Sequence, residues 1–307
     1  MRKHAALAVD EEVGTDGSFQ RRESRFREIV EHGEAGRYHL YVSLACPWAH
    51  RTVIYRRLKG LESAISMTIV DPERDELGWR ISDSVGTTPD PVNGFEYLSE
   101  AYVASASDFD GRVTVPVLWD TREGRIVNNE SSEIIRMLDS AFDGVSPHPG
   151  LHFAPAELRS EIDEINGFVY ASVNNGVYRC GFATKQAAYD AAFGKLFAAL
   201  DVLDARLGEQ RFLVGDRITE ADWRLFTTLV RFDAVYVGHF KCNLRRIADY
   251  RNLSGYLREL YQQPGIAGTV DFDHIKRHYY RTHGTINPTR IVPLGPAIDL
   301  DAPHGRE

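Results

Sequence analysis

Near the N-terminus runs the stretch Tyr41-Val42-Ser43-Leu44-Ala45-Cys46-Pro47-Trp48-Ala49-His50-Arg51, in which one cysteine separates a strand-like run from a helix-like run. Residues 37–42 alternate polar and apolar side chains, as a half-buried strand does. Pro47 suits the first turn of a helix, where its missing N–H is not needed. The sequence therefore predicts that Cys46 lies at a helix N-terminus.

A cysteine in that place is expected to be reactive. The unpaired backbone N–H groups and the positive end of the helix dipole favour a thiolate there. A dithiol exchanger carries its second cysteine three residues on, but that position is Ala49. Cys180 and Cys242 each stand isolated in the sequence, so we expect neither a disulfide framework nor a Cys-rich zinc site. Cys46 is therefore expected to borrow its second thiol from a small molecule such as glutathione.

Composition excludes several classes of partner. The chain has 307 residues, 43% of them hydrophobic, which suffices for one large domain or two ordinary ones. Its net charge of −8 comes from 44 acidic and 36 basic residues, and this balance argues against a nucleic-acid partner. No apolar run approaches the roughly 18 residues that span a bilayer, so no membrane partner is expected. Unpaired cysteines without an export signal indicate a cytoplasmic location.

The order of elements in the first half is that of a thioredoxin-like α/β domain. After the first strand we expect a helix over 48–59, a strand over 65–70, an irregular insertion over 71–112, two strands over 114–119 and 125–127, and a helix over 131–142. Pro116 stands inside a strand, where it removes a ladder donor. A thioredoxin-like order of elements has a cis-proline at this strand, so we expect the Val115–Pro116 bond to be cis. A cis bond there would leave the Val115 backbone free to pair with an extended tripeptide.

The second half is predicted to be all-α. Apolar residues recur at helical spacing over 158–170, 187–207, 223–237 and 253–261. Thr219, with Asp222 three residues later, has the spacing of a capping box. We therefore expect an N-terminal arm at 1–36, the thioredoxin-like domain at 37–145, a linker at 146–155, the helical domain at 156–284 and an irregular tail at 285–307.

Several motifs, spread from about Phe19 to about Pro296, agree in order with one family. A thioredoxin-like half followed by a helical half resembles the glutathione transferase superfamily, and the motifs resemble its xi class, the glutathionyl-hydroquinone reductases. The motifs are Cys46-Pro47-Trp48-Ala49-His50-Arg51, Val115-Pro116-Val117-Leu118-Trp119-Asp120, Asn128-Asn129-Glu130-Ser131-Ser132-Glu133-Ile134-Ile135, Leu213-Val214-Gly215-Asp216, Thr219-Glu220-Ala221-Asp222, Phe240-Lys241-Cys242-Asn243, His274-Ile275-Lys276-Arg277-His278-Tyr279-Tyr280 and Ile286-Asn287-Pro288.

The resemblance implies a set of functional residues. Cys46 falls on the nucleophile that strips glutathione from a glutathionylated hydroquinone. Glutathione is then a cosubstrate, with no tightly bound cofactor and no metal, and the resemblance suggests a homodimer. The matching tyrosines near the thiol are Tyr178, Tyr236 and Tyr279, with Tyr280 as the alternative to Tyr279, and the glutathione-binding positions are Trp79, Val115, Pro116, Glu130 and Ser131.

Other interpretations stay open. Glu130 and Ser131 also have the pattern of a plain helix cap, and Trp79 also suits packing of the insertion. His274 and His278 stand four apart, as two metal ligands do, but neighbouring basic residues favour packing contacts. The alternative functions are an omega-like thioltransferase or dehydroascorbate reductase, and a non-catalytic binding module of the same fold.

Overall fold

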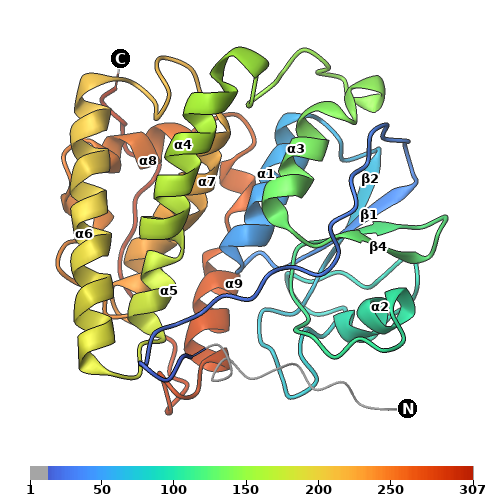
Figure 1. The fold of residues 1–307 in the computed structure, drawn as a ribbon, viewed down its shortest axis with the longest axis horizontal. Coiled ribbons are helices and arrows are strands. Elements are labelled where there is room, and N and C mark those ends of the chain that lie inside the picture. The colour runs from blue at the N-terminus through green and yellow to red at the C-terminus, as the bar shows by residue number, and fades with distance from the viewer. Residues whose placement is uncertain (1–12, 307) are drawn as a thin grey trace. The chain divides into compact units, whose positions relative to one another are not determined.

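The computed structural model describes residues 13–306, and contacts divide these into two units, of which the first contains a four-stranded sheet (Figure 1). The strands are β1 (Tyr38–Val42), β2 (Ile65–Ile69), β3 (Val117–Asp120) and β4 (Arg125–Asn128), in the order β2-β1-β3-β4. β1 pairs parallel with β2 and antiparallel with β3, and β3 pairs antiparallel with β4. This arrangement confirms the thioredoxin-like domain.

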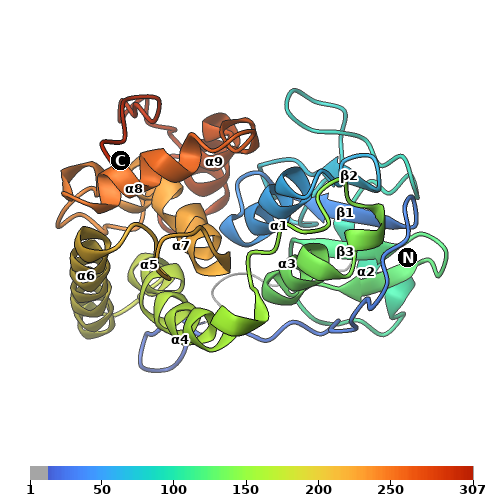
Figure 2. The same ribbon diagram turned by 90° about the horizontal axis from the view of Figure 1, so that it is seen from above.

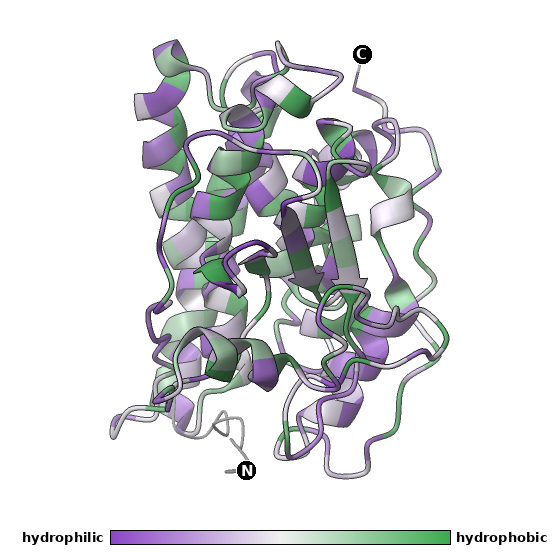
Figure 3. Ribbon diagram, turned by 90° about the vertical axis from the view of Figure 1, so that its right-hand side faces the viewer, coloured by the Kyte–Doolittle hydropathy of each residue, from purple (hydrophilic) through white to green (hydrophobic). Residues whose placement is uncertain are grey.

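Helices cover both faces of this sheet. α1 (Pro47–Leu58) and α3 (Ser131–Ser140) lie side by side on one face, and α2 (Leu98–Ser105) lies on the other (Figure 2). Ile134, Ile135 and Leu138 of α3 are fully buried, which gives this helix a single apolar stripe. Figure 3 shows how hydrophobic and hydrophilic positions alternate along the helices and strands. α2 lies inside the predicted insertion, where its short apolar pattern is masked by surrounding Pro and Gly residues.

The expectation of a half-buried first strand is wrong. All five residues of β1 are buried, because the strand lies between β2 and β3 in a sheet that is covered on both faces. The polar side chain in this strand, His39, has partners for both ring nitrogens. Its Nδ1 lies 2.6 Å from the Ser66 hydroxyl and its Nε2 lies 2.9 Å from the Thr68 hydroxyl. Side chains of β2 thus supply the polar contacts that solvent would otherwise make.

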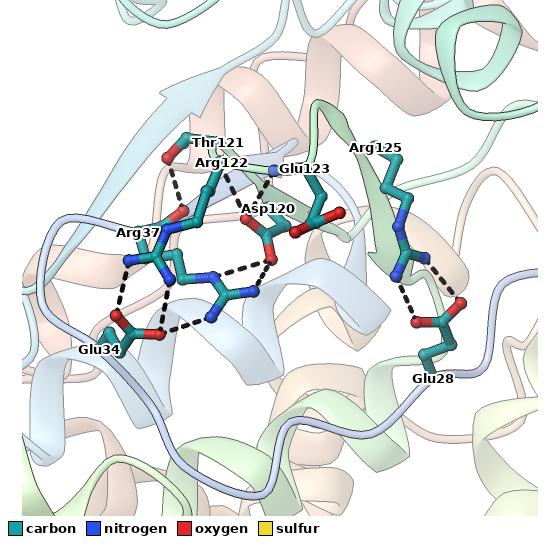
Figure 4. A network of polar contacts seen from close by, with 8 residues as sticks. All are labelled: Glu28, Glu34, Arg37, Asp120, Thr121, Arg122, Glu123 and Arg125. Atoms are coloured by element: carbon teal, nitrogen blue, oxygen red, sulfur yellow. Dashed lines mark hydrogen bonds and ion pairs between the residues drawn. The ribbon is translucent and has the colours of Figure 1, made fainter.

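Ion pairs tie the segment before β1 to the β3–β4 hairpin (Figure 4). The Arg37 guanidinium donates to the Asp120 carboxylate at 2.9 and 2.6 Å. The Glu34 carboxylate accepts from both Arg37 and Arg122. Because these charges link two segments that are distant in sequence, 34–37 and 120–122, they hold together the end of the sheet opposite the end of β1 that leads to Cys46.

The second unit is a group of helices, as predicted. They are α4 (Arg159–Val169), α5 (Gly176–Gly181), α6 (Gln186–Glu209), α7 (Glu220–Arg231) and α8 (Leu253–Tyr261). α4 and α7 each continue into one π-helical turn, over Tyr170–Asn174 and Phe232–Tyr236. The capping box of Thr219 and Asp222 is present at the start of α7 and confirms that prediction. Within residues 13–306 no helix is both long and apolar enough to cross a membrane.

The boundaries of the units differ from the expected segments. Of the predicted arm, residues 13–22 belong to the helical unit, where Arg21 donates to Asn175 at 2.9 Å. Residues 23–36 belong to the sheet unit, where the Glu28 N–H donates to the Val127 carbonyl at 3.1 Å. The first 12 residues and residue 307 lie outside the described part of the chain. The arm is therefore shared between two cores, which its local sequence does not indicate.

Two neighbouring C-terminal segments belong to different units. Residues 269–282, which contain α9 (Phe272–Arg277), belong to the sheet unit, although we expected the helical domain to extend to residue 284. The tail over 283–306 has no regular helix or strand beyond its first turn and packs on α8. There Arg306 pairs with Glu259 at 3.0 Å, and Gln262 donates to the Leu300 carbonyl at 2.7 Å. The tail is irregular, as expected, but it is held by specific contacts.

Candidate active site

The thiol of Cys46 lies at the start of α1. Cys46 is the N-cap residue, with extended backbone angles of φ −79° and ψ 122°, and Pro47 follows it in the first helical turn. Its side chain is half-buried and makes no capping hydrogen bond to the helix. The Sγ atom instead lies 3.7 Å from the Val115 carbonyl oxygen. The thiol is thus left available at the positive end of a helix, as predicted.

The segment whose carbonyl lies nearest the thiol contains a cis-proline. The Val115–Pro116 peptide bond is cis, as the order of elements predicted. The Val115 side chain is buried, and among the described residues its N–H has no hydrogen-bond partner. An extended peptide could therefore pair with this backbone by strand addition.

Glu130 and Ser131 form the start of α3. Glu130 is the N-cap, and its carboxylate accepts from the Ser132 N–H at 3.1 Å and from the Ser24 hydroxyl at 3.1 Å. Ser131 is buried, and its hydroxyl oxygen accepts from Arg51 Nη1 at 3.4 Å. The plain cap is therefore present in this structure. An anion would meet a hydroxyl and a helix N-terminus at the same place.

Two neighbours of the thiol in the sequence were not singled out as functional residues. Arg51 is fully buried, and its guanidinium lies 4.5 Å from the ring centre of Trp48. His50 is also fully buried, and its Nε2 lies 2.8 Å from the Thr269 hydroxyl. Both follow Cys46 on α1, but their distant partners have no signature in local spacing. These contacts link the helix that bears the thiol to α3 and to the C-terminal segment of the same unit.

Trp79 lies in the long segment between β2 and α2 and is 5% exposed. Its ring stacks on His278, with ring centres 5.0 Å apart and planes at 17°. The Arg74 guanidinium lies 5.4 Å from the ring centre. Trp79 therefore packs within the segment that the sequence predicts as an insertion, and its orientation is set by the residues around it.

The candidate tyrosines are divided between the units. Tyr279 lies in the sheet unit, in a π-helical turn over His278–Thr282, and is 1% exposed, whereas its neighbour Tyr280 is half-buried. Tyr178 and Tyr236 lie in the helical unit, where their ring centres are 6.2 Å apart. Phe240 stacks on Tyr236 at 5.4 Å and lies edge-on to Tyr178 at 5.5 Å. The structure thus brings Tyr178 and Tyr236 into one aromatic cluster.

The other two cysteines are not isolated in space. Cys180 in α5 and Cys242 are both buried, and their thiols lie close enough to affect each other's ionisation. Burial, together with this contact, raises the pKa of Cys242 well above its ordinary value, so the thiol stays protonated. Two buried neutral thiols are suited to packing, in contrast to the available thiol of Cys46.

Metal-ligand geometry is not seen in the described residues. Within residues 13–306 no three His, Cys, Asp or Glu side chains come together as a metal site would require. His274 is buried beside Gly86, and a Cβ at that glycine would lie 2.3 Å from His274 Nε2. His278 stacks on Trp79. The spacing of these two histidines thus corresponds to packing contacts with the segment after β2.

Both halves of the chain match known family models. The model described as the glutathione S-transferase N-terminal domain matches residues 45–141. The model described as the glutathione S-transferase C-terminal domain matches residues 186–259. The first match begins one residue before Cys46 and ends just after α3, so it includes the thiol, the cis-proline and the start of α3.

Full-length relatives are also similar to this chain. Glutathionyl-hydroquinone reductase YqjG of Escherichia coli (strain K12) is 54% identical, with 95% of this chain and 93% of the relative covered. Glutathionyl-hydroquinone reductase PcpF of Sphingobium chlorophenolicum is 55% identical, with 92% and 91% covered.

Solved structures agree with these relatives. The glutathione-bound structure of YqjG has a TM-score of 0.87 and 56% identity, with 90% of this chain and 89% of that chain covered. The Xi class GST from Natrialba magadii has a TM-score of 0.93 and 52% identity, with 97% and 94% covered. With both domain models matched and more than half of the residues identical along nearly the whole chain, this chain belongs to the Xi-class glutathione transferases, the family of the glutathionyl-hydroquinone reductases.

Proposed function

We propose that this chain reduces glutathionyl-hydroquinones to hydroquinones through a mixed disulfide between Cys46 and glutathione. The observation that carries the proposal is the place of the thiol. It is half-buried at the start of α1 and lies 3.7 Å from the Val115 carbonyl, and Ala49 stands where a second cysteine would be needed for an internal disulfide. The relatives named glutathionyl-hydroquinone reductases support the choice of substrate.

The reaction has two steps, cleavage of the carbon–sulfur bond and then thiol–disulfide exchange. In the first, the Cys46 thiolate attacks the sulfur of the glutathionyl-hydroquinone, an S–S bond forms and the C–S bond breaks. The ring carbon takes a proton, and hydroquinone leaves. In the second, a glutathione thiolate attacks the glutathione sulfur of the mixed disulfide and releases Cys46 as a thiolate with oxidised glutathione. The ring carbon is reduced, and the two glutathione sulfurs are oxidised.

The residues that the family resemblance assigns to glutathione have the chemistry to bind it. The Val115 backbone next to Pro116 is placed to pair with the cysteinyl part of the tripeptide. The Ser131 hydroxyl at the start of α3 suits the γ-glutamyl carboxylate, and the Glu130 carboxylate suits the ammonium group. Trp79 contributes an aromatic surface to the same ligand. A relative of this chain has been solved with glutathione bound, which supports glutathione as the cosubstrate.

The resemblance leads us to propose separate roles for three tyrosines. Tyr178 supplies the proton to the ring carbon, and Tyr236 and Tyr279 donate hydrogen bonds that favour the Cys46 thiolate. Tyr178→Phe should then slow hydroquinone release and spare the later thiol exchange. Tyr236→Phe and Tyr279→Phe should shift iodoacetamide labelling of Cys46 to higher pH. The same labelling profile in all three variants would contradict these roles.

A steady-state assay with three substrates separates the candidate activities. The proposal predicts that a glutathionyl-hydroquinone is turned over faster than hydroxyethyl disulfide or dehydroascorbate. Mass spectrometry of substrate-treated protein should find glutathione on Cys46 and not on Cys180 or Cys242. Preference for either of the other substrates would favour an omega-like activity, and no turnover of any would favour a binding module. An internal disulfide as the working intermediate would contradict the single-thiol mechanism.

We also propose that the chain acts as a homodimer in the cytoplasm. The homodimer follows from the family resemblance, and the location follows from the three cysteines that stand isolated in the sequence. Sedimentation of the purified chain across a concentration range tests the assembly. A single monomeric species at all concentrations would contradict it.

A further inference from the structure

The C-terminal segment over 269–282 returns to the sheet unit and holds the segment that contains Trp79. Glu73 accepts from Arg277 and Arg281, each at 3.0 Å. The Arg74 N–H donates to the Thr282 hydroxyl at 3.2 Å. These contacts come from residues about 200 positions apart in the sequence. The segment after β2 is therefore fixed by a distant part of the chain and not by its own secondary structure.

His278 makes the central contacts of this arrangement. Its Nδ1 lies 2.7 Å from the Pro72 carbonyl oxygen, and because a carbonyl only accepts, Nδ1 carries the proton and donates. The same ring lies against Trp79, with ring centres 5.0 Å apart and planes at 17°. His278 is 8% exposed and Trp79 is 5% exposed, so solvent has little access to this stack. One imidazole thus links the backbone of the segment to the tryptophan that it carries.

The position of Trp79 depends on this stack. The Arg74 guanidinium lies 5.4 Å from the centre of the Trp79 ring. Removal of the His278 ring would leave one face of the indole without its neighbour and the Pro72 carbonyl without its donor. The indole could then turn about its side-chain bonds. His278 precedes Tyr279 in the same π-helical turn, so this turn orients Trp79 and also carries a candidate tyrosine.

We propose that His278 is a positioning residue for glutathione, because it holds the Trp79 indole in the orientation that receives the tripeptide. The proposal rests on the proposed function, since it takes Trp79 to be part of the glutathione site. His278 acts through Trp79 and needs no contact with the reacting sulfur. Its loss should therefore weaken glutathione binding while the chemical step at Cys46 is retained.

Three substitutions separate the two contacts of His278. His278→Ala removes both, His278→Phe keeps a ring against Trp79 without the donor, and His278→Asn keeps a donor without the ring. Calorimetric titration with glutathione, on the reduced full chain, should show affinity reduced roughly two- to tenfold in His278→Ala, the range expected for an aromatic pair. Steady-state assays should show a raised KM for glutathione with kcat little changed. His278→Phe and His278→Asn should each retain part of the affinity, and His148→Ala, at an exposed position, should retain all of it.

A double-mutant comparison decides whether the effect passes through Trp79. In a Trp79→Ala background, His278→Ala should cause no further loss of glutathione affinity. An equal loss in both backgrounds, or no loss in His278→Ala alone, would overturn the positioning role. Unchanged glutathione affinity in Trp79→Ala alone would also overturn the positioning role, because it would show that Trp79 is not part of the glutathione site. Since Cys46 glutathionylation is measured separately by mass spectrometry, failure of His278 to act is distinguishable from failure of the proposed reaction.

Discussion

Two helix starts in this chain are built in opposite ways. At the start of α7, Asp222 is fully buried and accepts hydrogen bonds from the Thr219 N–H at 2.7 Å, the Leu213 N–H at 2.9 Å and the Tyr256 hydroxyl at 2.8 Å. At the start of α1, the Cys46 side chain is half-buried and makes no capping hydrogen bond. The N–H groups at the start of α7 thus have side-chain partners, whereas the Cys46 thiol at the start of α1 caps nothing.

The difference shows how one backbone feature serves stability or chemistry. The first turn of any helix has N–H groups without partners inside the helix. When side chains satisfy them within a core, as at α7, the helix start adds to stability. When the capping position holds a side chain that makes no cap, as Cys46 does at α1, these N–H groups stay open to another partner beside the thiol that we propose as the nucleophile. The start of α3 combines both, because Glu130 caps the helix while Ser131 is proposed to bind glutathione.

The largest effect should come from Cys46→Ser. Without the thiol the proposed reduction has no nucleophile, so turnover of a glutathionyl-hydroquinone should fall at least about 1,000-fold. The free energy of unfolding should change by less than about 0.5 kcal/mol, because the side chain makes no capping bond. Turnover and urea unfolding measured on the same sample check both. Cys180→Ser and Cys242→Ser should keep most of the activity, and substantial turnover in Cys46→Ser would contradict the mechanism.

Asp222→Ala should lower the stability of the fold and leave the activity intact, the reverse of Cys46→Ser. It leaves several buried donors without an acceptor, so the free energy of unfolding should fall by about 3–5 kcal/mol. Turnover per folded molecule should be retained. Urea unfolding at neutral pH measures the loss, and Asp216→Ala, at an exposed carboxylate six residues earlier, is the control. Equal stability of the two variants would show that the hydrogen bonds of Asp222 at the start of α7 do not stabilise the fold.

Lowering the pH should show how much the buried His39 side chain, whose two ring nitrogens both have hydroxyl partners, affects the free energy of unfolding. Burial lowers the pKa of His39 to about 4, compared with an ordinary value of 6.5. The unfolded chain therefore binds the proton first as pH falls, and stability should decrease between pH 6.5 and 4, by roughly 3 kcal/mol from this residue. Urea unfolding of His39→Gln across this range should show a shallower decrease than the original chain. Parallel curves would mean that His39 does not set the acid response.

The smallest effect is expected at the start of α3, where Glu130 caps the helix and Ser131 is proposed to bind glutathione. Ser131→Ala should weaken glutathione binding by about 1–3 kcal/mol through loss of a hydrogen bond to a charged group, while the fold persists. Calorimetric titration with glutathione measures this loss. Ser140→Ala, at the exposed far end of the same helix, should bind normally. Unchanged affinity in Ser131→Ala would leave the start of α3 with a capping role alone.

Features that depend on neighbours in the sequence could be predicted. Pro47 after Cys46 indicated a helix start, and the Thr219 and Asp222 spacing indicated another, because capping involves residues within one turn. The order of strands and helices was sufficient to predict the sheet and the cis bond before Pro116. The family motifs added the candidate site residues, whose roles the proposed experiments test.

Features that depend on distant partners could not be predicted in this way. Full burial of β1 follows from the strands and helices around it, and the buried thiols of Cys180 and Cys242 are neighbours in space although they stand 62 positions apart in the sequence. The return of residues 269–282 to the sheet unit places His278 against Trp79, although the local sequence of that segment shows only two histidines at helical spacing. Local sequence determined where α1 and α7 begin and which thiol stands at a helix start. Tertiary structure decided which side chains meet, because those contacts depend on chain reversals and packing that local spacing does not encode.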